Sequence, residues 1–340
     1  MNILTTGGAG YIGSHTCVEL LEQGYNVIVI DNLYNSSEES LNAVEKITNK
    51  KLNFIQGDLR NIEDIRKCFN NYKIDAVIHF AGLKAVGESV SKPLLYYENN
   101  VYGSLNLFKV MNEFNVKKII FSSTATLYGD STAYPFTEDL PKVAINPYAK
   151  TKLFIEDILE DLCKSDPDWS VISLRYFNPI GAHESGDIGE DPNGIPNNLL
   201  PYISQVAIGK LDILNVFGND YDTPDGTCIR DYIHIVDLAK GHTQAINKLI
   251  NSKGMNIYNL STGIGYSVLD IINSFEKATG IKIKYKITER RAGDAPIGYG
   301  NPSKAYNELG WKAKYNIDDM CRHTWNWQTK HPNGYKKGSY

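Results

Sequence analysis

A tyrosine and a lysine four residues apart, in the segment Tyr148-Ala149-Lys150-Thr151-Lys152, could carry out proton transfer. On a helix this spacing puts the Tyr148 phenol and the Lys152 ammonium on one face. A free tyrosine has a pKa of about 10, too high for a base at neutral pH, and a neighbouring cation favours the phenolate. The pair therefore predicts Tyr148 as a general base and Lys152 as the cation that lowers its pKa. Pairs at this spacing also occur by chance in helices without a catalytic role.

A glycine-rich segment, Gly7-Gly8-Ala9-Gly10-Tyr11-Ile12-Gly13, follows a predicted strand and opens a predicted helix. Residues without side chains let the backbone approach a pyrophosphate, and the helix N-terminus offers unpaired N–H groups. Asp31 ends the next predicted strand, where it can accept hydrogen bonds from an adenosine ribose and would repel a 2′-phosphate. The segment therefore predicts dinucleotide binding, with NAD favoured over NADP.

Hydroxyl side chains follow another predicted strand, in Ser122-Ser123-Thr124-Ala125-Thr126. We assign Thr124 to hydrogen-bond the reacting oxygen beside Tyr148. The alternative is that these hydroxyls only satisfy the backbone of a turn. Asp58 also follows a strand, and the sequence does not decide whether it caps a helix or meets the adenine amine.

A sheet with flanking helices would bring these residues together. The predicted strands span residues 2–5, 26–30, 52–56, 76–80, 118–122 and 170–175. Helices are predicted over 93–114 and 148–164, and apolar residues at helical spacing in the first are interpreted as core: Leu94, Val101, Leu105, Phe108 and Met111. The alternation predicts an α/β fold, a doubly wound parallel sheet of Rossmann type, with its ligands at the carboxyl ends of the strands.

The alternation stops after Arg175, and residues 181–201 are rich in Gly, Pro, Asn and Asp. This change predicts two domains. The first, over residues 1–177, would bind NAD. A smaller C-terminal domain over residues 178–340 would bind the substrate, with the provision that some of its segments can return to the first domain.

Composition excludes several classes of function. The 340 residues, 42% hydrophobic and 22% charged, fit a globular protein, and the net charge of −4 gives no general reason to bind nucleic acid or an anionic membrane. No apolar run reaches the ~18 residues of a membrane span and no Lys or Arg precedes Lys46, so we expect a cytoplasmic protein. The cysteines form no C-x-x-C pair and the histidines no H-E-x-x-H motif, so we expect no metal site.

The chain resembles the extended short-chain dehydrogenase/reductase family of nucleotide-sugar enzymes, and most closely its 4-epimerases. The resemblance is carried by three motifs in this order: the glycine motif, the Ser-Ser-Thr strand end and the Tyr-x-x-x-Lys pair. Residues 79–89, 175–179, 194–199, 230–234 and 290–294 carry the same resemblance, which therefore covers nearly the whole chain. It implies an enzyme that interconverts UDP-glucose and UDP-galactose through a transient 4-keto sugar. NAD would stay bound as the cofactor that takes and returns the hydride, Tyr148 would take the proton of the 4-hydroxyl, and the chain would form a homodimer through the helices over 93–114 and 148–164.

The resemblance also implies individual roles. NAD would be held by Gly7, Gly10, Tyr11, Ile12, Gly13, Asp31, Asn32, Asn35, Ser36, Asp58, Leu59, Phe80, Ala81, Lys84, Asn99, Tyr148, Lys152 and Phe177. The UDP-hexose would be held by Lys84, Thr124, Thr126, Tyr148, Asn178, Asn198, Leu199, Asn215, Phe217, Arg230, Arg291, Asp294 and Gly298. Arginine forks suit a diphosphate, although an arginine in a loop is more often a solvated surface charge.

Three observations bear on which reaction and which substrate the resemblance implies. Thr124 stands where many relatives carry serine, and it keeps the hydroxyl. Related 4,6-dehydratases and decarboxylases place an acidic residue near Ala125 or Thr126, and its absence here argues against dehydration. Gly298 stands where some relatives place a tyrosine against the hexose, so we expect room for UDP-N-acetylglucosamine and UDP-N-acetylgalactosamine. Alternatively, Gly298 is only a flexible loop residue, or Tyr299 fills that wall.

Two other functions stay open at this point. The chain could be an epimerase that prefers a nucleotide-linked uronic acid. It could also be a catalytically silent NAD-binding regulator, because a fold does not determine a function.

Overall fold

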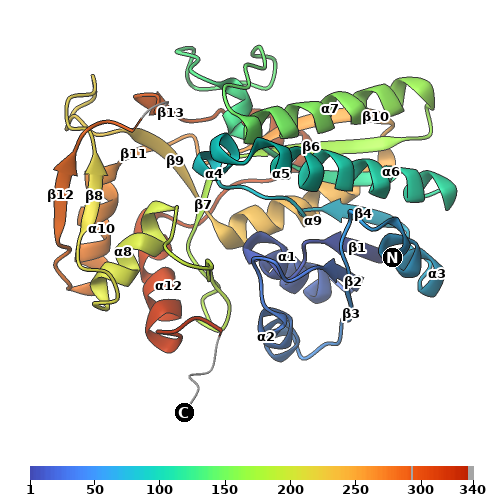
Figure 1. The fold of residues 1–340 in the computed structure, drawn as a ribbon, viewed down its shortest axis with the longest axis horizontal. Coiled ribbons are helices and arrows are strands. Elements are labelled where there is room, and N and C mark those ends of the chain that lie inside the picture. Colours follow the sequence, from blue (N-terminus) through green and yellow to red (C-terminus); the bar gives the residue numbers. More distant parts are fainter. Residues whose placement is uncertain (292–293, 336–340) are drawn as a thin grey trace.

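A parallel seven-stranded sheet dominates the computed structural model, which describes residues 1–291 and 294–335. The strand order is β10-β6-β5-β4-β1-β2-β3, and every neighbouring pair is parallel (Figure 1). The strands are β1 (Asn2–Thr6), β2 (Asn26–Asp31), β3 (Asn53–Gln56), β4 (Ala76–His79), β5 (Lys118–Thr124), β6 (Ser170–Tyr176) and β10 (Gly254–Leu260). The predicted Rossmann-type sheet is thereby confirmed.

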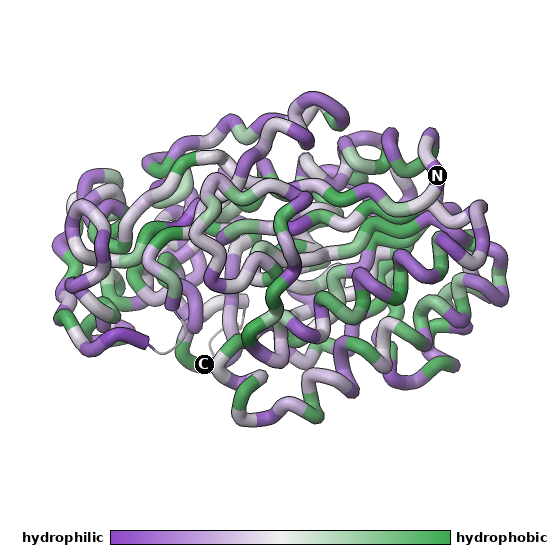
Figure 2. Tube along the Cα trace, turned by 90° about the horizontal axis from the view of Figure 1, so that it is seen from above, coloured by the Kyte–Doolittle hydropathy of each residue, from purple (hydrophilic) through white to green (hydrophobic). Residues whose placement is uncertain are grey.

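Helices cover both faces of this sheet and bury two separate cores. On one face lie α1 (Tyr11–Glu22), α2 (Glu38–Thr48) and α9 (Ile235–Asn251), and on the other α3 (Ile62–Asn71), α6 (Gly103–Glu113) and α7 (Pro147–Ser165). Adjacent strand residues enter opposite cores, as Ile3 and Leu4 do, because side chains alternate across a strand. In Figure 2 the central strands are accordingly hydrophobic, whereas the outer helices alternate in hydropathy.

The helix predicted over residues 93–114 consists of three parts. They are α5 (Pro93–Tyr96), a π-helical segment over Tyr97–Tyr102 and α6, and the short helix α4 (Val86–Ser91) precedes them. Phe108 and Met111 are buried as predicted, but Leu94 is 81% exposed, so its assignment to the core was wrong. The wider π turn rotates the preceding residues relative to α6, so the apolar stripe of α6 does not continue upstream.

A second group of elements surrounds a core of its own. It contains β7 (Asn178–Ile180), α8 (Leu199–Ala207), β8 (Leu214–Phe217), β9 (Ile229–His234), β11 (Gly265–Ser267), α10 (Val268–Thr279), β12 (Tyr285–Thr288), β13 (Ile297–Gly298) and α12 (Ile317–Lys330). Strand β9 pairs with β7, β11 and β13, and β8 pairs with β12. Helices α8, α10 and α12 bury Ile203, Phe275 and Met320 together.

The chain returns to the large sheet after entering this second group. Helix α9 packs on α1, and β10 pairs with β6 from Gly254–Ser170 to Leu260–Tyr176. Helix α11 (Ser303–Leu309) then packs against α9 and β10. The division predicted between residues 177 and 178 therefore marks only the first crossing between the two groups. Within the described ranges, no helix has the length and apolarity to cross a membrane.

Candidate active site

The candidate catalytic side chains lie at the carboxyl ends of the central strands. Thr124 is the last residue of β5, and Tyr148 lies in the first turn of α7. Helix α7 begins where the sequence favours a helix start: Pro147 opens it, and the Asn146 side chain accepts a hydrogen bond from the Ala149 N–H at 2.9 Å. This cap fixes the first turn, so Tyr148 is held beside the end of β5.

Thr124 contacts both the Tyr148 phenol and its own turn. Burial raises the pKa of Tyr148, and the side-chain hydrogen bond with Thr124 lowers it. The Thr124 hydroxyl also accepts from the Thr126 N–H at 3.2 Å and lies 3.0 Å from the Thr126 hydroxyl. The Thr124 hydroxyl therefore satisfies its own turn, and its role beside the base stays a prediction.

The Lys152 ammonium is buried and faces the backbone of β5. Its Nζ donates to the Ser122 carbonyl at 2.8 Å and lies 4.9 Å from the centroid of the Phe121 ring. Burial lowers the pKa of Lys152 to about 8. Burial also raises the pKa of Tyr148, so its ionised form depends on stabilisation by neighbouring groups. A buried ammonium requires an acceptor, and in this structure the Ser122 carbonyl supplies it. The effect of Lys152 on the phenol stays a prediction.

The glycine-rich turn packs too closely for side chains. Gly7 has φ of +70°, and a Cβ there would lie 2.7 Å from the Ala81 nitrogen. A Cβ on Gly13 would lie 2.4 Å from the Gly7 carbonyl oxygen. Gly10 is the N-cap of α1 and has no side chain to cover the first N–H groups of the helix. The turn therefore fits the pyrophosphate of a dinucleotide.

Asp31 connects this turn to the end of β2. One carboxylate oxygen accepts from the Ala9 N–H at 3.0 Å, and the other accepts from the Leu33 N–H at 2.9 Å and the Ser36 hydroxyl at 2.8 Å. Its carboxylate is thus fixed at the strand end where the ribose of a dinucleotide is expected. Asp31 also orders the loop that contains the predicted cofactor residues 32–36.

We expect Asp31→Ala to weaken NAD binding by about 10- to 100-fold, because charge-assisted hydrogen bonds are lost. NADP binding should weaken less, since the same change removes repulsion of the 2′-phosphate. Calorimetric titration with both cofactors measures the two affinities, and Asp161→Ala, an exposed change on α7, is the control. An unchanged preference between the cofactors would exclude this role for Asp31.

Asp58 lies beside the same loop. It accepts from the Asn32 amide at 3.0 Å and from the Arg60 guanidinium, whose hydrogen bond is the largest cause that lowers the pKa of Asp58 to about 2. Helix α3 is capped by the Asn61 side chain, so Asp58 is not its cap. The other alternative, contact with the adenine amine, stays a prediction.

Glu190 joins two predicted ligand residues, although the sequence analysis missed it. Its Oε1 accepts from the Lys84 ammonium at 2.9 Å and from the Asn198 amide at 2.7 Å. The Tyr11 hydroxyl donates to the nearby Gly181 carbonyl at 2.6 Å. Glu190 belongs to a segment that the sequence identified only as an ordered loop, and no spacing motif indicated its role.

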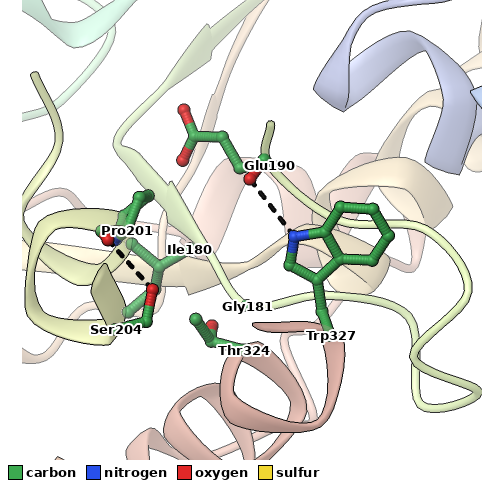
Figure 3. A pocket seen from close by; sticks show the side chains of 7 residues that line it. All are labelled: Ile180, Gly181, Glu190, Pro201, Ser204, Thr324 and Trp327. Carbon is green, nitrogen blue, oxygen red and sulfur yellow. Dashed lines mark hydrogen bonds between the residues drawn. The ribbon is translucent and has the colours of Figure 1, made fainter. Parts of the chain in front are cut away.

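Behind Glu190 lies a small internal cavity of about 10 Å³ (Figure 3). Its lining residues are Ile180, Gly181, Glu190, Pro201, Ser204, Thr324 and Trp327. Figure 3 shows the Trp327 indole donating to the Glu190 carbonyl and the Ser204 hydroxyl donating to the Pro201 carbonyl. This volume is about that of one water molecule, so the cavity cannot take a hexose.

Two arginines that the sequence predicts for the substrate share the carboxylate of Asp294. Asp294 accepts from the Arg291 guanidinium at 2.9 and 3.2 Å and lies 3.9 Å from that of Arg230. Arg291 also lies over the ring of Phe217, at 5.8 Å from its centroid. The Asn215 side-chain oxygen on the same strand as Phe217 is buried, with no hydrogen-bond partner within the described part of the chain. Ala292 and Gly293, in the segment 290–294 that resembles the family, lie outside the described residues.

Comparisons with known proteins agree with this arrangement. A family model described as GDP-mannose 4,6 dehydratase matches residues 4–324. The chain is 57% identical to UDP-glucose 4-epimerase of Bacillus subtilis over 336 residues, 99% of each chain. It also resembles the crystal structure of UDP-glucose 4-epimerase from Bifidobacterium longum in complex with NAD+ and UDP, with a TM-score of 0.96, 55% identity and coverage of 98% and 100%.

A third likeness is to the UDP-Glc/GlcNAc 4-epimerase of Campylobacter jejuni, with a TM-score of 0.84, 35% identity and coverage of 97% and 99%. Together these likenesses extend over almost the full length of the chain and confirm the resemblance carried by its motifs. The chain belongs to the UDP-glucose 4-epimerase family of nucleotide-sugar enzymes, and it is an epimerase.

Proposed function

We propose that this protein interconverts UDP-glucose and UDP-galactose by inverting C4 of the hexose, with NAD as its cofactor. The observation that carries the proposal is the hydrogen bond from Lys152 of α7 to the Ser122 carbonyl near the end of β5. It joins the helix of the Tyr–Lys pair to the strand that ends in Thr124, on the sheet whose first strand leads into the glycine turn. The full-length likeness to UDP-glucose 4-epimerases, one of them solved with NAD+ and UDP, supports it.

The cofactor would be held by the glycine turn before α1, by Asp31 at the end of β2 and by Lys152 on α7. NAD supplies, when bound, a reversible acceptor for the hydride of C4. The Asp31 carboxylate suits the ribose of NAD, and the close packing around Gly7 and Gly13 suits its pyrophosphate.

Tyr148 would take the proton of the 4-hydroxyl and return it. Because burial raises the pKa of the phenol, its ionised form needs stabilisation, and the Thr124 hydroxyl provides part of it. Lys152, one helical turn away, is a buried cation that favours negative charge in the same region.

Arg230 and Arg291 would grip the diphosphate through their guanidinium forks, with Asp294 between them. Such anchoring at the nucleotide leaves the hexose free to turn, so that the hydride can return to its other face.

We also propose that the protein forms a homodimer. The exposed side chains of Leu94 and Tyr102, on the segment over 93–102, and of Phe154 on α7 support this proposal.

The test of the proposed function is conversion of UDP-galactose to UDP-glucose by the purified protein, together with release of a nicotinamide cofactor on denaturation. Both results are expected. Activity on UDP-glucuronic acid alone would favour the uronic-acid epimerase, and released NAD without turnover of either sugar would favour a silent NAD-binding protein.

We also propose activity on UDP-N-acetylglucosamine, because Gly298 presents no side chain beside Arg230. A Cβ on Gly298 would lie 3.6 Å from the Phe136 ring and 4.0 Å from Arg230 Cδ, which are ordinary contact distances. The Tyr299 ring packs against Tyr134, at 5.5 Å between centroids. The name of the Campylobacter jejuni relative indicates that this fold can accept the acetylated sugar.

We expect Gly298→Tyr to lower kcat/KM for UDP-N-acetylglucosamine by about 10- to 200-fold while UDP-glucose is little affected, since a bulky side chain would fill the space of the acetyl group. The matched control is Gly298→Ala, whose methyl group meets only ordinary contacts and should keep both activities. The idea fails if the unmodified protein ignores the acetylated sugar or if the tyrosine variant accepts it equally well.

A further inference from the structure

Helix α7 carries a buried carboxylate that the proposed reaction does not use. Glu156 is 0% exposed and lies one turn beyond Lys152, so Tyr148, Lys152 and Glu156 share one face of the helix. Its partner is Arg175 on β6, also buried, which donates through Nε to Oε1 at 3.1 Å and through Nη2 to Oε2 at 2.8 Å. This bidentate geometry is the strong form of the arginine–carboxylate pair.

Two serines connect the same carboxylate to adjacent strands. The Ser123 hydroxyl on β5 donates to Glu156 Oε1 at 2.6 Å, and the Ser173 hydroxyl on β6 donates to the same atom at 2.8 Å. Ser123 lies between Ser122, whose carbonyl accepts from Lys152, and Thr124, which contacts the phenol. Glu156 therefore joins α7 to β5 at the point where three candidate active-site groups meet.

Arg175 extends this network away from α7. Its Nη1 donates to the Tyr128 hydroxyl at 3.1 Å and to the Glu138 carbonyl at 3.2 Å. Tyr128 in turn donates to the Asn259 side chain of β10 at 2.6 Å. The Arg175 guanidinium is thus held by hydrogen bonds to Tyr128, Glu138 and Glu156, so the Glu156 carboxylate cannot shift without it.

Glu156 also places a buried negative charge one helical turn from Lys152. Tyr148 and Glu156 lie one turn from Lys152 on the same face of α7, and the charges of Lys152 and His79 on β4 interact. Arg175 on β6 is bound to Glu156. Burial lowers the pKa of His79 to about 3, so that ring is neutral near pH 7. Burial lowers the pKa of Lys152, whereas the negative charge of Glu156 raises it. Burial would raise the pKa of Glu156 itself, but the hydrogen bonds and charge of Arg175 and the two serines hold it below its ordinary value.

We propose that Glu156 is a positioning residue of the epimerase: with Arg175 and Ser123 it holds the catalytic face of α7 against the end of β5, and it keeps a negative charge one helical turn from Lys152. The expected change in kcat rests on the proposed function, because it presupposes that the protein is an epimerase. A purely structural ion pair is the competing interpretation, since apolar residues can often replace a buried pair.

The first experiment compares the unmodified protein with Glu156→Gln, which keeps the shape of the side chain and removes its charge. The titration of Lys152 is followed by NMR on protein labelled with ¹³C at the lysine Cε, with Lys152→Ala to assign the signal. We expect the titration to move to lower pH by about one unit, because an anion is lost and the Arg175 cation remains.

The same variant should lower kcat by about 10-fold. The alkaline loss of activity should also begin at lower pH, since activity requires the charged form of Lys152 and that form is lost as the pH rises through its pKa. Glu160→Gln, one turn further along α7 in an exposed pair with Lys164, is the matched control and should change neither measurement.

An unmoved Lys152 titration and an unmoved alkaline limb in Glu156→Gln would overturn the inference, even if its melting temperature falls. The NMR titration does not depend on turnover. A protein that fails to convert UDP-galactose would therefore disprove the proposed function, while the titration still decides the role of Glu156.

A second comparison keeps both charges and covers the case in which Glu156→Gln does not fold. Ser123→Ala and Ser173→Ala each remove one hydrogen bond to Glu156 Oε1, from β5 and β6 respectively. We expect Ser123→Ala to lower kcat by about 3- to 10-fold with KM unchanged, because it releases the strand that carries Thr124. Ser173→Ala should stay near the activity of the unmodified protein, and equal kcat values in the two variants would contradict the proposal.

Discussion

Replacing Tyr148 with phenylalanine is expected to lower kcat for epimerisation by roughly 10²-fold or more, the usual scale for the loss of a general base. The phenyl ring keeps the packing of the first turn of α7, so NAD and the UDP-sugar should still bind. Only the hydroxyl that contacts Thr124 and exchanges the proton is removed. Initial rates of UDP-galactose conversion, measured beside the content of bound NAD, separate the lost chemistry from lost binding.

Tyr306→Phe is a suitable control for this experiment, because its side chain is 57% exposed on α11. It removes a phenolic hydroxyl away from the strand ends and should leave the rate unchanged. If Tyr148→Phe matched the rate of the unmodified protein, Tyr148 could not be the base, and another group would have to receive the proton of the 4-hydroxyl.

Lys152→Ala is expected to have two effects, a fall in kcat of about 10²-fold and weaker retention of NAD. The ammonium is proposed to serve both the ribose of the cofactor and the ionisation of Tyr148. Its removal also leaves the Ser122 carbonyl without its donor, at the end of the strand that carries Thr124. The rate, and the cofactor released on denaturation, are measured on the same preparation.

Lys150→Ala provides the matched control, because Lys150 lies on the same turn of α7 but faces solvent. Both measurements should stay unchanged in that variant. If Lys152→Ala altered only the melting temperature, Lys152 would be a structural residue and not part of the catalytic machinery.

Much of the large sheet could be predicted from local sequence, because strands buried on both faces have uninterrupted apolar runs. The predicted strand ends coincide with the observed ones or differ from them by at most two residues. Strand β10 was missed for a physical reason: it lies at the edge of the sheet, its first four residues are only half-buried, and Asn256 and Asn259 interrupt its apolar pattern. The π turn before α6 likewise has no sequence signal that would show Leu94 leaving the core.

The candidate site was predictable where a motif is contiguous in the sequence. The glycine turn, the Ser-Ser-Thr strand end and the Tyr–Lys pair each position neighbouring residues, so spacing alone indicates their chemistry. Glu190 and Glu156 were not predictable, because their partners come from distant parts of the chain: Lys84 for Glu190 and Ser123 for Glu156. Neither does spacing show that the Ser122 carbonyl accepts a hydrogen bond from Lys152.

The late return of the chain to β10 has a consequence for biosynthesis. Strand β6 is buried along its whole length, and its outer edge is paired only when residues 254–260 are in place. While the protein is being made, the ribosome must add more than eighty residues after Tyr176 before that edge can be covered. The exposed row of N–H and C=O groups can pair with other chains in the meantime. A nascent chain that stalls at the end of the predicted first domain is therefore an aggregation hazard and a candidate client of chaperones that shield unpaired strands.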